Sequence, residues 1–101
     1  GDYLVADLGN HRILLCSSKS PSSLCVNVTG TGEAGSGPGQ LDFPSAVMES
    51  PSGDFLIADR NNNRILLCYK VSHGSDCDTV AGVEGPVDIA VDAFGDYVIA
   101  A

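Results

Sequence analysis

Short apolar segments recur along the chain, and glycine, proline or polar residues separate them every 8 to 15 residues. The segments LVA, LIA and ILLC are continuously apolar, and none shows a sustained period of 3.6 residues. Short runs rich in β-branched and aromatic side chains, with turn residues between them, predict an antiparallel meander of β-strands. Continuous apolar runs are typical of strands whose two faces are both covered. We therefore expect an all-β chain with strands at 46–49 and 87–91, at 3–6, 55–58 and 97–100, at 12–16 and 64–69, and at 25–29 and 78–81.

The chain repeats itself at an offset of 52 residues. Residues 1–16 read GDYLVADLGNHRILLC, and residues 53–68 read GDFLIADRNNNRILLC. Over residues 1–30 and 53–82, 16 of 30 aligned positions are identical. Unrelated sequences of ordinary composition would share about two. Such self-similarity indicates a repeat architecture.

A third, partial copy follows at a shorter offset. Residues 86–100 match residues 44–58 at an offset of 42. The missing ten residues fall in the Gly-rich stretch 31–42, and length variation confined to one stretch indicates a surface loop.

Each repeat therefore holds four short strands, the sequence signature of β-propeller blades. A lone β-sandwich with duplicated hairpins is the alternative, and the near-identity of the repeats argues against it. We expect a partial β-propeller built of four-stranded antiparallel blades. Its predicted parts are 1–30 (the end of one blade), 31–43 (a Gly-rich inter-blade loop), 44–82 (a complete blade) and 83–101 (the start of a third blade). At about 40–50 residues per blade, this length cannot close a ring, so we expect an excerpt of a longer chain or self-assembly of copies.

The element G-D-(Y/F)-L-(V/I)-A-D-x-x-N-x-R-I and the lead-in P-x-x-(V/I)-x-x-(D/S)-x-x-G-D closely resemble the NHL repeat. The resemblance covers nearly the whole chain and implies a propeller that is usually six-bladed. Known members are protein-binding platforms, RNA-binding modules in ubiquitin-ligase proteins, or lyases of the peptide-amidation pathway. This chain departs from its own pattern where Ala101 takes the place of Asp7 and Asp59, and where Asn63 replaces His11.

Charge and composition restrict the function. The formal net charge is −8, from 13 acidic and 5 basic side chains. A phosphate-binding surface needs clustered Lys and Arg, so nucleic acid is not an expected partner. No apolar run is long enough to span a membrane. No catalytic or cofactor motif emerges, and two histidines in different loops offer no metal centre, so we expect no cofactor and no metal.

An aspartate, an asparagine and an arginine recur after the second strand of two repeats. Short Asp and Asn side chains accept hydrogen bonds from their own turn, and an Arg at the next strand start can pair with a carboxylate. A catalytic site normally needs residues that differ between blades, so this recurrence indicates a structural role. The set comprises Asp7, Asn10 and Arg12, and Asp59, Asn62 and Arg64.

Four cysteines form two pairs nine residues apart, Cys16/Cys25 and Cys68/Cys77. Each pair flanks a predicted Ser-rich or polar loop between antiparallel strands, where two Cα atoms can lie about 5.5 Å apart. Recurrence favours these local disulfides among three possible pairings, with reduced structural thiols and a metal site as alternatives. Asn27 begins a glycosylation sequon on the outermost strand. Together these features favour an extracellular or secretory-lumen setting over a cytoplasmic one.

The combination of repeated strands and variable loops predicts a non-catalytic scaffold that binds a protein or peptide. Propeller enzymes, either amidating-lyase-like or hydrolase-like, and RNA-binding propellers are the alternatives. We expect the binding face where the repeats differ most in their loops. The residues of these loops are Leu8, Gly9, Asn10, His11, Arg60, Asn61, Asn62 and Asn63, with the loop 31–43 beside them.

Overall fold

The computed structural model describes residues 3–17, 25–37, 39–69 and 77–101. The predicted Ser-rich loop and its counterpart around His73 lie outside these residues. The strands are β1 (Tyr3–Asp7), β2 (Arg12–Cys16), β3 (Cys25–Thr29), β4 (Pro44–Glu49), β5 (Phe55–Asp59), β6 (Arg64–Cys68), β7 (Cys77–Gly82), β8 (Asp88–Val91) and β9 (Tyr97–Ala100), with single 3-10 turns η1 (Leu8–Asn10) and η2 (Arg60–Asn62).

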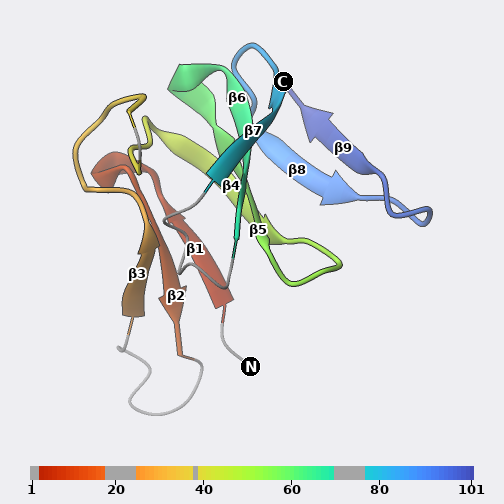
Figure 1. The fold of residues 1–101 in the computed structure, drawn as a ribbon, viewed down its shortest axis with the longest axis horizontal. Helices are drawn as coiled ribbons and strands as arrows, with labels where there is room; N and C mark the ends of the chain where they lie inside the picture. Colours follow the sequence, from red (N-terminus) through yellow and green to blue (C-terminus); the bar gives the residue numbers. More distant parts are fainter. Residues whose placement is uncertain (1–2, 18–24, 38, 70–76) are drawn as a thin grey trace.

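The strands form three antiparallel sheets in chain order, which we call the first, second and third sheets. The first has the order β1-β2-β3, the second β4-β5-β6-β7 and the third β8-β9. Figure 1 shows the sheets following one another, with the segment from β3 to β4 crossing between the first and second. The prediction of an all-β, antiparallel chain is confirmed.

The predicted strand boundaries need small corrections. The strand predicted for residues 64–69 ends at Cys68, the last residue that pairs with both β5 and β7. The strand predicted for 87–91 begins at Asp88, where pairing with β9 starts. β7 is longer than expected, because the pairing Cys68↔Cys77 begins it and Arg64↔Gly82 ends it.

Two matching hairpin turns connect the first and second strands of their repeats. The backbone N–H of Gly53 donates to Ser50 O at 2.9 Å, and that of Gly95 donates to Asp92 O at 3.1 Å. Both glycines have positive φ, 90° and 84°. Residues with a side chain rarely adopt this region of φ, which explains why glycine occupies the same place in both turns.

Strand β5 is buried on both faces because neighbouring sheets cover it. Phe55 and Ile57 belong to a core cluster with Ile13 and Leu41, which come from the first sheet and the β3–β4 segment. Leu56 and Ala58 belong to a second cluster with Ile65 and with Ile89 of the third sheet. Alternate residues of one strand therefore join it to the sheet before and to the sheet after.

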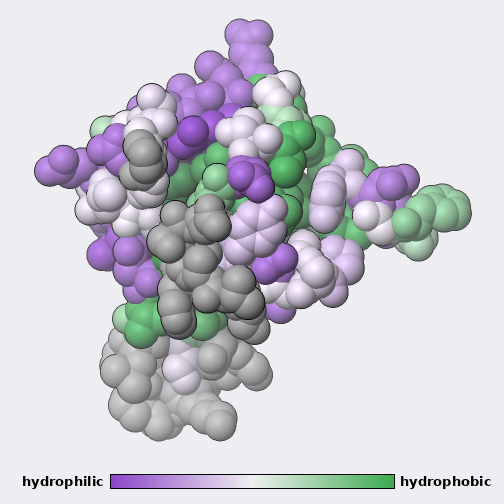
Figure 2. Space-filling view, viewed as in Figure 1, coloured by the Kyte–Doolittle hydropathy of each residue, from purple (hydrophilic) through white to green (hydrophobic). Residues whose placement is uncertain are grey.

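The corresponding strands of the two end sheets have one exposed face. Tyr3 and Val5 of β1 are 51% and 37% exposed, although their counterparts in β5 are buried. Val98 of β9 is also exposed, whereas Ile99 packs on the second cluster. Figure 2 shows hydrophobic surface over the β8–β9 hairpin and at its tip.

Within the described ranges, no helix is long and apolar enough to cross a membrane.

Candidate functional site

The end of the second sheet that carries η2 is organised by three side chains. The carboxylate of Asp59, at the end of β5, accepts hydrogen bonds from Nδ2 of Asn62 at 2.8 Å and from Nε of Arg64 at 2.7 Å. The Asp59 side chain is 0% exposed and that of Arg64 is 19% exposed. A buried carboxylate is stable only when it is paired and hydrogen-bonded, and Asn62 and Arg64 meet this need. We call Asp59, Asn62 and Arg64 together the second clamp.

The second clamp holds the segment 31–43 that arrives from the first sheet, which we call the connector. The backbone N–H of Asp42 donates to Oδ1 of Asp59 at 2.7 Å. Nδ2 of Asn62 donates to Gly35 O at 2.9 Å, and a terminal guanidinium nitrogen of Arg64 donates to Gln40 O at 3.0 Å. Three backbone groups of the connector are thereby fixed by side chains that the repeat supplies.

Asp7, Asn10 and Arg12 form the same arrangement on the first sheet, which we call the first clamp. Arg12 Nε donates to Oδ2 of Asp7 at 2.8 Å. Nδ2 of Asn10 donates to both carboxylate oxygens, each at 3.1 Å. The Arg12 hydrogen bond, followed by that of Asn10, lowers the pKa of Asp7 below its ordinary value. The predicted pairing of Asp, Asn and Arg within each repeat is thus present in both copies.

The residues after the two 3-10 turns also contact segments that link the sheets. His11 and Asn63 both adopt φ of 52°, in the left-handed region. Nδ1 of His11 accepts the backbone N–H of Phe43 at 3.0 Å, and Oδ1 of Asn63 accepts that of Gly85 at 3.0 Å. The predicted loop residues His11, Asn61, Asn62 and Asn63 are therefore engaged within the molecule, Asn61 through a 3.2 Å hydrogen bond to Oδ1 of Asp42.

Other predicted loop residues remain at the surface. Leu8, Gly9, Asn10 and Arg60 are exposed, and the Leu8 side chain is 39% exposed. Among the described residues, the Arg60 side chain has no hydrogen-bond or ion-pair partner. Leu8 and Arg60 occupy corresponding positions of the two repeats, so a partner would meet an apolar group on one turn and a cation on the other.

A pocket of about 350 Å³ opens between the connector and the outer strands of the first two sheets. Its wall combines hydroxyl, amide and guanidinium groups with the apolar side chains of Leu41 and Leu66. The polar residues are Thr29, Ser36, Gln40, Arg64 and Thr79. Such a mixed wall suits a small polar ligand or a peptide side chain.

The binding face expected from the sequence includes the connector, and with it Gln40, but not Thr29 or Thr79. These residues come from β3, the connector and β7, and they meet only because the connector folds back between two sheets. The ten extra residues of the connector relative to the later link were the available signal. A longer link between otherwise similar repeats has room to form a pocket wall.

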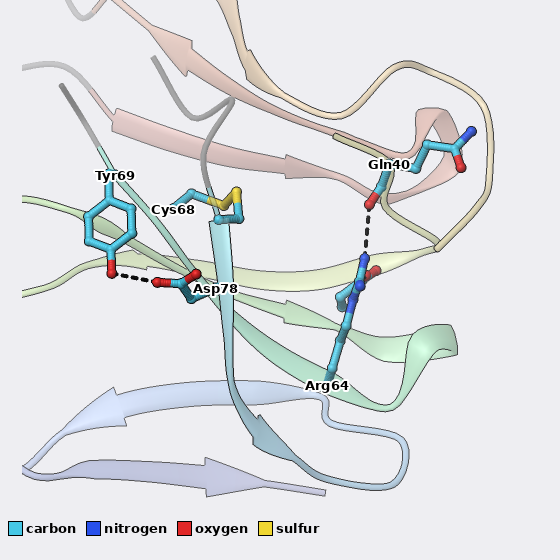
Figure 3. The surroundings of a disulfide bond; sticks show 7 residues. Gln40, Arg64, Cys68, Tyr69 and Asp78 are labelled. Carbon is cyan, nitrogen blue, oxygen red and sulfur yellow. Dashed lines mark hydrogen bonds and ion pairs between the residues drawn. A yellow bond between two sulfur atoms is a disulfide. The ribbon is translucent and has the colours of Figure 1, made fainter. Parts of the chain in front are cut away.

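Both predicted disulfides are present, Cys16–Cys25 and Cys68–Cys77. Each joins direct cross-strand partners, with Cα atoms 4.0 Å apart. Figure 3 shows Tyr69 donating to Asp78 near Cys68, at 2.8 Å, while Arg64 reaches Gln40 farther along β6. The two disulfides fit an oxidising extracellular setting.

Asn27 lies on β3, the edge strand of the first sheet, and is exposed. Its Nδ2 donates to Gly30 O at 2.9 Å.

No group of three or more His, Cys, Asp or Glu side chains that could hold a metal ion occurs among the residues that the structure describes.

No protein-family model matches this chain, and no curated protein matches it either. Among solved structures, the chain is similar to the crystal structure of an auxiliary nutrient binding protein from Bacteroides thetaiotaomicron VPI-5482. The TM-score is 0.73 at 17% sequence identity, over 97% of this chain and 32% of that chain. The similarity concerns the fold, and this chain spans about a third of the length of that protein.

Proposed function

We propose that the chain is part of a larger β-propeller of the NHL type and acts as a non-catalytic scaffold that binds a protein or peptide. The second sheet has four strands, and the sheets before and after it are built from other copies of the same repeat. This arrangement supports the assignment to a propeller. Resemblance to the NHL repeat adds the expectation of six blades in the whole protein. A neighbour in fold that is named a binding protein supports a binding role.

The binding face carries η1, η2 and the connector. This assignment is carried by a comparison of the two copies of the repeat. The clamp residues are identical in the two copies, whereas the other residues of the turns differ. A constant framework that displays variable loops is how repeat proteins vary their partners. The 350 Å³ pocket beside the connector gives this face a concave region.

Selection of a phage-displayed random peptide library on the immobilised chain tests this function. Selected peptides are titrated against Leu8→Ala and Arg60→Ala, because neither side chain supports the described hydrogen bonds of the fold. Phe94→Ala is the matched control, since Phe94 is 90% exposed in the β8–β9 turn at the opposite end of its repeat. We expect a loss of about tenfold or more in affinity for the two face variants, as for residues near the centre of an interface.

Two outcomes contradict the proposal. If the selected peptides lose affinity for Phe94→Ala and not for the face variants, the binding face is wrong. If no peptide is selected and a single-stranded RNA binds with a steep dependence on salt, the RNA-binding alternative replaces it.

A further inference from the structure

The walls of the pocket beside the connector all belong to the first and second sheets and to the connector that joins them. Thr29 comes from β3 and Thr79 from β7. Arg64 and Leu66 come from β6, and the connector supplies much of the remaining wall. The volume of about 350 Å³ lies within the range of small-ligand sites. The contact between two neighbouring repeats therefore creates a space large enough for a ligand group.

The hydroxyl of Thr29 is nearly buried and has no partner in the fold. Thr29 is 6% exposed and lines the pocket, and its side chain makes no hydrogen bond with any described residue. Every fully enclosed side-chain oxygen or nitrogen of the described residues has a hydrogen bond, so the Thr29 hydroxyl reaches accessible space. An unpaired hydroxyl in such a place is unfavourable until a ligand or a water molecule binds it.

The second copy of the repeat shows that the fold does not require this hydroxyl. At the offset of 52 residues, Ala81 stands where Thr29 stands in the first copy. Ala81 packs on the second core cluster without any hydroxyl. The clamp residues, which the fold uses in both copies, are identical in the two. The threonine is therefore a feature of this pocket and not of the repeat.

The guanidinium of Arg64 brings a positive charge to the pocket. Its Nε donates to Asp59 and its Nη2 to Gln40 O, which uses two of the five N–H donors of an arginine. Its Nη1 has no partner within the described ranges. Asp59 is 0% exposed and is not a wall residue, so the cation lines the pocket and its counter-charge does not. Figure 3 shows the Arg64 side chain extending from β6 to the connector at Gln40.

Hydrogen-bond donors dominate the rest of the wall. Ser36 and Thr79 add hydroxyls where the pocket opens to solvent. The carbonyls of Gly37 and Gln40 already accept hydrogen bonds from the Gln40 N–H and from Arg64. No Asp or Glu of the described ranges lines the pocket, although the chain has 13 acidic side chains. A concave wall with a guanidinium and hydroxyls but no carboxylate suits an anionic oxygen ligand.

We propose that this pocket binds the carboxylate of an acidic residue in a peptide, held by the Arg64 guanidinium and the Thr29 hydroxyl. Leu41 and Leu66, which also line the pocket, contact the methylene groups that carry the carboxylate. This assignment rests on the peptide-binding role proposed above and gives that role a chemical preference.

Short peptides test the preference, because titration followed by nuclear magnetic resonance measures weak affinities. The probe is acetyl-Gly-Glu-Gly-amide, and its matched control has Gln in place of Glu. We expect the Glu peptide to bind about tenfold or more tightly, since charge-assisted hydrogen bonds are the stronger ones, and to shift the methyl resonance of Thr29. Acetyl-Gly-Gly-Gly with a free carboxyl end separates the two sources of a carboxylate. If that peptide binds more tightly than the Glu peptide, the pocket recognises chain ends and the assignment to an acidic residue is overturned.

The matching change in the protein is Thr29→Val, which keeps the shape of the side chain and removes its hydroxyl. The protein is produced in a bacterial periplasm, where disulfides form and Asn27 carries no glycan, so that the substitution changes the pocket alone. We expect a loss of about fivefold or more in affinity for the Glu peptide. The melting temperature without peptide should stay the same or rise, because the removed hydroxyl has no partner in the fold. Thr31→Val is the control and should retain the affinity, since Thr31 is exposed and does not line the pocket.

The proposal is overturned if the Glu and Gln peptides bind equally, a comparison that needs only the unaltered protein. It is also overturned if Thr29→Val retains the affinity, because water alone then satisfies the hydroxyl, or if that variant melts at a lower temperature without peptide. Selected phage peptides that depend on Leu8 and Arg60 but show no preference for an acid would leave the proposed function intact and remove this inference. Binding of the Glu peptide that depends on Thr29 but not on Leu8 or Arg60 would support the pocket and count against the wider face.

Discussion

The backbone N–H of Phe43 donates to Nδ1 of His11 at 3.0 Å, which ties the end of the connector to the first sheet across 32 residues of sequence. The next repeat makes the same link between Gly85 and Oδ1 of Asn63. Phe43 and Gly85 have φ of 59° and 54°, and each precedes a proline. The replacement of His11 by Asn63, which looks like a departure in the sequence, preserves one hydrogen-bond acceptor at the same place.

Replacing His11 by asparagine should therefore retain stability. Asparagine provides a side-chain acceptor and tolerates the left-handed conformation better than most residues. His11→Ala removes the acceptor and should cost about 1 kcal/mol. Urea unfolding of both variants measures the difference. Equal losses for the two variants would show that the acceptor does not stabilise the link.

The two clamps should respond differently to the same substitution. Asp59→Asn leaves the Arg64 guanidinium without its buried carboxylate and weakens the hold on Asp42, so it should cost about 3–5 kcal/mol. Asp7→Asn alters a pair that is partly exposed to solvent, so it should cost much less. Thermal unfolding of the two variants checks the order. If Asp7→Asn were the more damaging change, the structural assignment of the second clamp would fail.

The carboxylate of Asp7 should titrate below the ordinary value of 3.8, because the Arg12 and Asn10 hydrogen bonds favour its charged form. A group whose pKa is lower in the folded state stabilises the fold above the unfolded pKa. That contribution is lost as the pH falls from about 3.8 through the lowered pKa of Asp7. A carbon-13 titration of the Asp7 side chain measures the shift, and Arg12→Ala should raise its pKa back toward 3.8. An unchanged titration in that variant would contradict the assigned cause.

Much of the fold could be predicted from the sequence because most segments occur twice. A strand, turn or cysteine pair inferred from one copy can be checked against the other. The pairing of β5 with β6, and the cysteine pair that ends β6 and begins β7, follow from patterns that occur twice. What the sequence did not reveal is the fold of the connector. Leu41 is buried between two sheets, yet it stands in a Gly-rich stretch without any strand pattern around it.

The candidate site was predictable in its location and less so in its chemistry. Asn61 and Asn62 differ from ordinary exposed loop residues because they bind Asp42 and Gly35, which lie 19 and 27 residues away. Long-range hydrogen bonds of this kind depend on how closely two sheets approach each other. The sequence pattern within one loop does not reveal that approach. Substitution of Asn61 or Asn62 would therefore disturb the connector as well as any partner contact.

The two disulfides should differ in their resistance to reduction. Cys68 is 0% exposed and belongs to the first core cluster, whereas Cys25 of the other disulfide is exposed on an edge strand. Access of a thiolate to sulfur limits the rate of exchange, so Cys16–Cys25 should be reduced first under mild dithiothreitol. Mass mapping of alkylated peptides gives the order, and the untreated protein should show no free thiol.

Replacing either pair with serine should cost roughly 2–3 kcal/mol, the effect expected for closing short loops.

Asn27 should carry a glycan when the chain passes through a secretory pathway that glycosylates. The sequon Asn27-Val28-Thr29 lies on edge strand β3, and Asn27 is exposed, so a sugar can extend into solvent without displacing the core. Expression in a secreting eukaryotic cell should give a mass increase that peptide N-glycosidase removes. Asn27→Gln and Thr29→Ala should both abolish the increase, whereas Thr29→Ser should retain it because the sequon accepts either hydroxyl residue. Thr29 lines the pocket and is nearly buried, so Asn27→Gln is the cleaner variant. A secreted protein with the unmodified mass would show that Asn27 is not an acceptor.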